Sequence, residues 1–245
     1  MVRDFGLPGI DGGSVILYPS QTSFEAGVVA HISADAERRH KQLGPSAKPL
    51  DESAVVSSAT ITAVGSNAVG MYKKVLVNEW RIAKYSRLEW VRVLAHELTH
   101  TAEFELFDGR IASPDSWLLE GFAEWVGYKV VESFGAQDFA LSRKDALDSI
   151  VTATSYQTFP SLGQLARNPD WTTWTRTLGR PATYRQAFIA VDYLIQERGL
   201  SPVIEYFRLF KKLNNRERNF VTAFGESVSA FDGRFSAHLN VLLRK

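Results

Sequence analysis

The chain has 245 residues, of which 45% are hydrophobic, enough for one sizeable domain with its own core. Its 28 basic and 27 acidic residues leave a formal charge of +1, and no stretch gathers one sign strongly enough to favour a nucleic acid or an anionic membrane as partner. The absence of cysteine excludes disulfides, thiolate metal sites and a cysteine nucleophile, so any metal ion must bind to nitrogen and oxygen ligands.

Membrane and export signals are not expected in this sequence. No apolar run approaches the roughly 18 to 20 residues that a membrane span requires. Residues 1–20 lack a basic region followed by an apolar core, which a secretory signal would need. The compartment therefore stays open, with a secreted or cell-envelope location as the alternative if an export signal has been removed. No pattern indicates an oligomeric state.

The first eighty residues predict a mixture of strands and helix. Apolar or β-branched runs predict strands at residues 15–18, 54–64 and 75–77. A helix-like stretch runs from Ser23 to Leu43, and Gly44-Pro45 is expected to end it, followed by an exposed loop over residues 44–53. The run at 75–77 has two interpretations. It is either an edge strand to which an extended peptide could add through backbone hydrogen bonds, or an ordinary interior strand.

From Ser86 onward the apolar residues follow a helical period. Ser86 and Glu89 match a capping box, which places a helix start upstream of His96. The expected buried face of this helix consists of Leu88, Val91, Leu94, Ala95, Leu98 and Ala102. After a turn-rich loop at 107–114, Ser113 or Asp115 is expected to cap a second helix that runs to about Phe134.

The remainder of the chain, residues 138–245, predicts further helices. Loops are expected near Phe159-Pro160, Asn168-Pro169 and Gly179-Arg180-Pro181. Together the elements predict an α+β fold in a single domain. Residues 1–106 would form a mixed α/β-sheet lobe that ends with the central helix, and residues 107–245 a mostly helical lobe.

His96-Glu97-Leu98-Thr99-His100 matches the pattern HExxH. Four-residue spacing on a helix puts both imidazoles on one face, close enough to bind one metal ion. A hydrolytic zinc site needs three protein ligands and an open position for water, and Glu120 on the second helix is the candidate third ligand. Glu124, one turn later, can accept the free ring N–H of a liganding histidine. The alternative is that both glutamates belong to the solvated face of an amphipathic helix.

HExxH followed by Trp117-Leu118-Leu119-Glu120-Gly121-Phe122-Ala123-Glu124-Trp125 resembles the gluzincin, or peptidase MA-like, metallopeptidases. The resemblance covers residues 86–134, and that superfamily includes the thermolysin-like and M1 aminopeptidase branches. It implies a zincin-like fold in which His96, His100 and Glu120 bind zinc. It also implies that Glu97 is the general base that activates water and that Glu124 supports a ligand.

The C-terminal half carries two weaker similarities to the same superfamily. Residues 183–194 are similar to the M1-branch segment that holds a catalytic tyrosine, which implies that Tyr184 donates a hydrogen bond to the tetrahedral oxyanion. The alternative is a packing residue whose hydroxyl contacts water. Residues 224–239 are similar to the helical tail of peptidase MA-like domains and bear on the fold alone.

The remaining histidines and the tryptophans show no pattern that indicates a metal or catalytic site. His31, His40 and His238 have no neighbour of ligand type at a suitable interval, so they are expected to be surface or core residues. The six tryptophans are expected to fill the core and the cleft walls. Trp171 and Trp174 have a second interpretation, as part of a substrate path.

These observations predict a zinc-dependent peptidase of the gluzincin type that acts on a peptide or protein substrate. Glu103 and Leu106 stand where metzincins have a glycine and a third histidine, which excludes that pattern. No segment matches the GxMEN sequence with which M1 aminopeptidases hold a substrate amino terminus, so endopeptidase and aminopeptidase both stay open. Three alternatives remain: a catalytically silent zinc-binding interaction or sensor domain, a structural protein with unmetallated histidines, and a zinc hydrolase of non-peptide amides.

Overall fold

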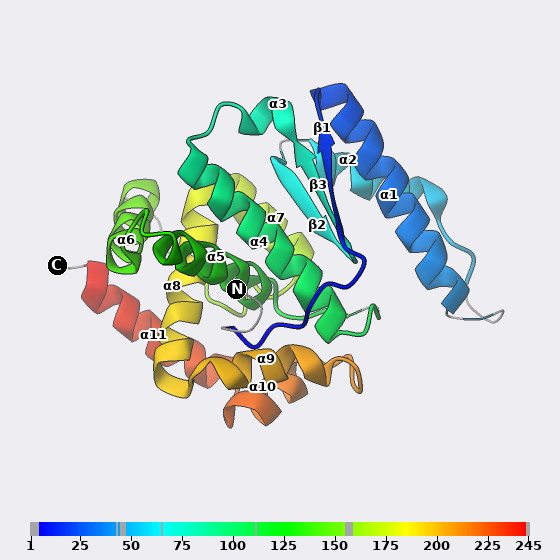
Figure 1. Ribbon diagram of the computed structural model, residues 1–245. Coiled ribbons are helices and arrows are strands. Elements are labelled where there is room, and N and C mark those ends of the chain that lie inside the picture. The colour runs from blue at the N-terminus through cyan, green and yellow to red at the C-terminus, as the bar shows by residue number, and fades with distance from the viewer. Residues whose placement is uncertain are drawn as a thin grey trace.

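The computed structural model describes residues 5–42, 44, 48–64, 66–110, 112–154 and 159–243. Within these residues the fold is mixed α and β, mostly helical, with a small three-stranded sheet (Figure 1). The strands are β1 (Ser14–Tyr18), β2 (Ala68–Met71) and β3 (Lys74–Asn78). The helices are α1 (Gln21–Gln42), α2 (Glu52–Ala63), α3 (Glu79–Ile82), α4 (Arg87–Leu106), α5 (Ser116–Ser133), α6 (Phe139–Thr154), α7 (Asn168–Leu178), α8 (Arg180–Arg198), α9 (Leu200–Leu209), α10 (Arg216–Phe224) and α11 (Val228–Leu243).

β3 is the central strand of the sheet. It pairs in parallel with β1 and antiparallel with β2, so β2 lies at an edge. Alternate side chains of β3 serve two separate cores, because successive residues of a strand point to opposite faces. Leu76 packs against Phe24 of α1, whereas Val75 and Val77 pack with Val93 of α4. The sheet therefore lies between α1 and α4, as Figure 1 shows.

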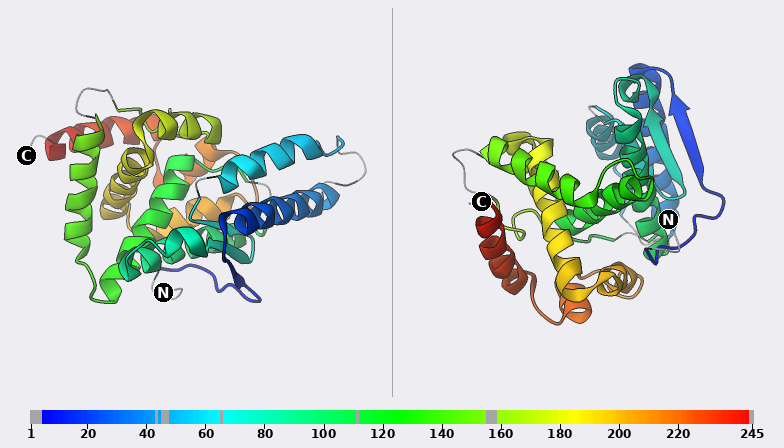
Figure 2. Two further views of the ribbon diagram at one scale, coloured as in Figure 1. Left: turned by 90° about the horizontal axis from the view of Figure 1, so that it is seen from above. Right: turned by 60° about the vertical axis from the view of Figure 1, so that its left-hand side comes forward.

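Of the predicted strands, two are confirmed and one is wrong. Residues 15–18 and 75–77 lie in β1 and β3, and the second interpretation of 75–77, an interior strand, is the correct one. Residues 54–64, expected to be a strand, belong to α2 apart from the last residue. Asp51, the N-cap residue of α2, accepts a hydrogen bond from the Ala54 amide. α2 packs along α1, and the two helices project together from the rest of the molecule (Figure 2). The edge strand β2 was not predicted.

The predicted helix at 23–43 is confirmed as α1, although it begins two residues earlier. Its terminating signal was Gly44-Pro45, of which Pro45 lies outside the described residues. The loop expected at 44–53 is shorter than predicted, because α2 already begins at Glu52.

α4 begins as predicted, but its buried face differs from the expected one. Both hydrogen bonds of the capping box between Ser86 and Glu89 are present. The expected apolar positions Leu88, Val91, Leu94 and Leu98 are only partly buried. The buried set instead includes polar side chains, among them His96, Thr99 and Glu103. An apolar period alone could not reveal that this helix buries its polar residues.

α5 runs through the helical part of the molecule, between α4 and α8. It ends at Ser133, close to the predicted Phe134. Gly121 permits close packing of α5 on α8, since a Cβ atom there would collide with the Ala187 carbonyl of α8. Asp115 occupies the N-cap position, but its side chain makes no capping hydrogen bond. It accepts a hydrogen bond from the Tyr206 hydroxyl instead, at 2.8 Å.

The C-terminal elements agree with the predicted helical region. The loop near Phe159-Pro160 is confirmed for the described residues. Asn168-Pro169, expected in a loop, begins α7, where proline is compatible with the first turn. Gly179, with φ of 86°, separates α7 from α8. The expected boundary between two lobes at residues 106 and 107 stays a prediction.

Among the residues that the structure describes, no helix is sufficiently long and apolar to cross a bilayer.

Candidate metal and catalytic site

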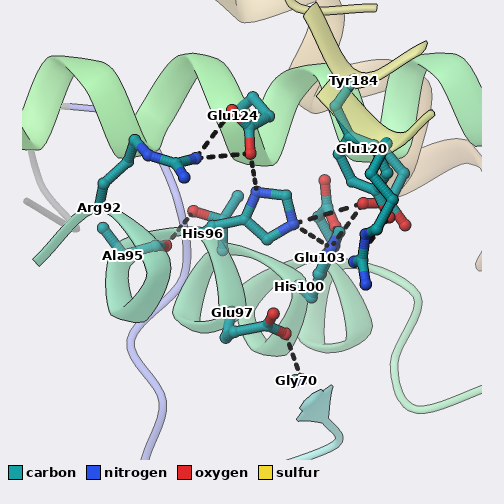
Figure 3. A network of polar contacts seen from close by, with 12 residues as sticks. Gly70, Arg92, Ala95, His96, Glu97, His100, Glu103, Glu120, Glu124 and Tyr184 are labelled. Atoms are coloured by element: carbon teal, nitrogen blue, oxygen red, sulfur yellow. Dashed lines mark hydrogen bonds and ion pairs between the residues drawn. The ribbon is translucent and has the colours of Figure 1, made fainter. Parts of the chain in front are cut away.

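α4 and α5 pack against each other and carry the residues of HExxH and the two glutamates of the second helix (Figure 3). His96 Nε2 lies 3.1 Å from His100 Nε2. Glu120 Oε2 lies 3.3 Å from the first of these nitrogens and 3.5 Å from the second. One ligand atom from each residue can be chosen so that all three lie within 4.8 Å of one another, which suits a single metal ion. Elsewhere in the described chain, no other group of three such residues meets this criterion.

The outer ring nitrogens of both histidines face carboxylates. His96 Nδ1 lies 3.2 Å from Glu124 Oε1, and His100 Nδ1 lies 2.7 Å from Glu103 Oε2. A carboxylate at Nδ1 favours the tautomer that carries its proton there, which leaves the Nε2 lone pair unprotonated. Both Nε2 atoms are thereby prepared to accept a cation from the same side.

Glu124 is held by two arginines. Arg92 Nη1 donates to both carboxylate oxygens, at 2.8 and 2.9 Å, and Arg185 Nη1 donates to Oε2 at 2.6 Å. Burial alone would raise the pKa of Glu124, but Arg92, Arg185 and His96 hold it well below its usual range. Glu124 therefore stays ionised and fixed in place beside His96.

The charges of the cluster favour a cation at its centre. Burial lowers the pKa of His96, but the contacts with Glu120 and Glu124 outweigh burial and raise it to about 9. The pKa of His100 is raised well above its ordinary value, because Glu120 and Glu103 likewise outweigh burial. The two imidazoles in turn lower the pKa of Glu120 against the effect of burial. A metal ion would supply the positive charge that protons supply otherwise.

Glu97 projects from α4 towards the edge strand β2. Its Oε2 accepts a hydrogen bond from the Gly70 amide at 2.5 Å. A Cβ atom at Gly70 would lie 2.5 Å from the Glu97 carbonyl oxygen, so only glycine permits this approach. The Asn67 carbonyl accepts a hydrogen bond from the Asn78 amide of β3. Because hydrogen-bonded pairs alternate along an antiparallel ladder, the backbone N–H and C=O groups of residues 68 and 70 point away from β3.

A cavity of about 240 Å³, called the small cavity below, adjoins His96 and Glu97. It is lined by Asn67, Ala68, Tyr85, Arg92, Val93, His96, Glu97, Glu124, Arg180, Tyr184 and Arg185. The Tyr184 ring lies 6.2 Å from the His96 ring, and its hydroxyl accepts a hydrogen bond from Arg180 Nη2 at 3.4 Å. The structure thus brings Tyr184 to the site that the sequence analysis assigned to it.

A second cavity, of about 770 Å³ and called the large cavity, adjoins His100 and Glu120. Many of its lining residues are apolar or aromatic: Phe104, Phe107, Ala112, Pro114, Leu119, Ala166 and Trp171. Trp171 meets the Tyr184 ring edge-on, with centroids 5.1 Å apart. Trp171 therefore lines a cavity beside the site, and its second interpretation, as part of a substrate path, stays a prediction.

Comparison of the chain with protein-family models, with curated proteins and with solved structures finds no match.

The other histidines and tryptophans that the sequence analysis considered do not line either cavity. His31, His40 and His238 are partly buried. Trp174 is partly buried against the main core. The expectation that all tryptophans fill the core or cleft walls is wrong for Trp80, which is 49% exposed because α3 places it on the surface.

Several residues of the site were missed by the sequence analysis. Glu103 contacts His100 from three residues along the same helix, a spacing that could have indicated it. Arg92 precedes His96 by four residues and Arg180 precedes Tyr184 by four, but neither belongs to a motif. Gly70 carried no signal, because only the folded position of β2 brings its amide to Glu97.

Proposed function

We propose that this chain is a zinc-dependent peptidase of the gluzincin type with a zincin-like fold. The observation that carries the proposal is the convergence of His96, His100 and Glu120 on one point, with Glu97 beside them. Zinc accepts nitrogen and oxygen ligands, and its hydrolytic sites use three protein ligands. The donor set and the carboxylates behind both histidines fit that requirement.

A bound zinc ion would acidify a water molecule and polarise the carbonyl of the cleaved bond. Glu97 is the base that removes the proton from water and delivers it to the leaving amine. The Gly70 amide orients the Glu97 carboxylate through one oxygen, so the other remains able to face the water. Tyr184 is a hydrogen-bond donor for the oxyanion, and its raised pKa, caused mainly by burial, keeps its proton in place.

The edge strand β2 is the surface on which an extended peptide would bind. The residue 68 amide and the carbonyls of residues 68 and 70 point away from β3, and residues of β2 line both cavities. A peptide that added to this edge would be held by backbone hydrogen bonds and would run past Glu97. The cavities at the His96 end and the His100 end of the site would then receive side chains from both sides of the cleaved bond. This arrangement supports an endopeptidase rather than an enzyme that requires a free amino terminus.

Metal analysis combined with turnover tests the proposal. Protein purified without added zinc should contain about one zinc ion per chain, and a chelator should abolish hydrolysis of a peptide library until zinc is restored. His96→Ala is expected to lose the metal, because two remaining ligands make a poor zinc site. Stoichiometric zinc without hydrolysis would instead support the silent binding domain, and absence of zinc would support the structural alternative.

A further inference from the structure

Three arginines line the small cavity. Arg92, Arg180 and Arg185 all line its 240 Å³, together with the carboxylates of Glu97 and Glu124. The three guanidinium groups outnumber these two carboxylates, and the two positive charges of a zinc ion at His96 would exceed the single negative charge of the nearby Glu120. The cavity therefore favours an anionic occupant.

The three arginines have different roles in this cavity. Arg92 and Arg185 are partly buried, pack over the Tyr128 ring and share the single carboxylate of Glu124. Their donors are directed at a structural partner. Arg180 begins α8, is exposed, and reaches Tyr184 through a long hydrogen bond of 3.4 Å. Of the three, Arg180 combines solvent access with a position beside the proposed catalytic tyrosine.

The size of the cavity limits what it can hold. Ligand pockets usually measure about 300 to 1,000 Å³, so 240 Å³ accommodates part of a ligand, such as one side chain or one chain terminus. Guanidinium groups pair with carboxylates through two parallel hydrogen bonds, a geometry that Lys cannot reproduce. The large cavity holds only two arginines, Arg167 and Arg216, in about 770 Å³, and apolar and aromatic side chains line much of the rest.

We propose that the small cavity binds a carboxylate of the peptide substrate, on a residue next to the cleaved bond, and that Arg180 is the residue that selects it. The inference rests on the proposed peptidase function and adds a substrate class to it. The carboxylate comes either from an Asp or Glu side chain or from the free carboxyl terminus of the substrate. These two sources share the same chemistry and are separated by experiment.

The test uses a randomised octapeptide library, synthesised once with free carboxyl termini and once as amides. Cleavage sites are identified by mass spectrometry, and kcat/KM is then measured for matched peptides with Glu or Gln at the enriched position.

Arg180→Gln is compared with Arg180→Lys and with the control Arg176→Gln. Arg176 is an exposed arginine of α7 that lines neither cavity. In parallel, the library is passed over immobilised Glu97→Gln protein, with and without Arg180→Gln, and the retained peptides are sequenced.

The native protein should prefer the Glu peptide about 10- to 100-fold, as expected for a charge-assisted pair. Arg180→Gln should bring this ratio close to one, Arg180→Lys should give an intermediate ratio, and Arg176→Gln should leave the ratio unchanged. If the preference depends on free-acid peptides instead, the terminal carboxylate is the source.

Cleavage without a carboxylate preference, or a preference that survives Arg180→Gln, would overturn the inference and leave the peptidase intact. If acidic peptides are retained through Arg180 but no peptide is cleaved, the proposed peptidase function is refuted and the proposed carboxylate site is supported. Neither cleavage nor selective retention would overturn both.

Discussion

Glu120 and Glu124 lie one turn apart on α5, yet they meet different atoms of the same histidine. Glu120 faces His96 Nε2, the nitrogen that also approaches His100, whereas Glu124 faces Nδ1. The spacing of the two glutamates could not decide which one is the ligand. The geometry supports the order that the family resemblance implies.

Zinc titration of Glu120→Ala and Glu124→Ala separates the two roles. Glu120→Ala removes one of three protein ligands, so its site should be nearly empty at limiting zinc. Glu124→Ala should weaken zinc binding by about 10- to 100-fold, because it only orients His96, and the site should refill at higher zinc. A larger loss for Glu124→Ala would mean that the ligand and its supporter are reversed.

At the residue scale, the sequence predicted the residues that belong to a recognisable motif and missed those that do not, such as Glu103 and Arg92 of α4. His96 and His100 follow from the four-residue spacing, and Glu120 follows from the need for a third protein ligand on the next helix. Arg185 could not be predicted, because nothing local indicates that α8 brings it to Glu124. Contacts between distant helices depend on packing, which a single sequence does not display.

Close packing of α5 on α8 holds Glu120, the proposed third ligand, at the site. A Cβ atom at Gly121 would collide with the backbone of Ala187, which cannot move away as a flexible side chain could. Gly121→Ala should therefore lower the free energy of unfolding by about 1 to 3 kcal/mol, measured by urea denaturation. Gly233→Ala is the matched control, because this helical glycine of α11 has no neighbour within 4 Å. The control should be neutral or stabilising by up to about 1 kcal/mol, and equal effects at both positions would refute the packing argument.

Asp115 joins the start of α5 to α9 and α10 through Tyr206 and Arg216. Burial raises its pKa to about 6, although both partners oppose the rise. An acid whose pKa is raised on folding adds stability below its unfolded pKa, near 3.8, and loses that stability as the pH rises through 6. The free energy of unfolding of the native protein, relative to Asp115→Asn, should therefore fall by about 3 kcal/mol at most between pH 3.5 and 7. A pH-independent difference between the two proteins would contradict the raised pKa.

At the element scale, the errors of prediction have a physical cause. The β-branched residues of 54–64 favour a strand only weakly, and the capping by Asp51 with packing along α1 outweighs that preference. The buried Ala59 and Ala63 are small enough for such close contact. β2 spans only Ala68–Met71 and contains a glycine, so it offers no alternating pattern to detect.

Across the whole molecule, the site depends on parts that lie far apart in the chain. β2 supplies the amide that contacts Glu97, α4 and α5 supply the proposed metal ligands, and α8 supplies Tyr184 and Arg180. The sequence predicted the mixed character of the fold and its mostly helical second half, because long helices carry strong local signals. It did not predict how the short edge strand meets the motif helix.

The hydrolysis rate of Glu97→Gln, at a zinc content equal to that of the native protein, tests whether Glu97 is the general base of a zinc peptidase. The amide keeps the shape of the side chain and removes the base. The account predicts unchanged folding and zinc content with kcat lower by about 100- to 10,000-fold. Hydrolysis at a comparable rate would contradict the account, because the proton would then be taken by some other group than Glu97.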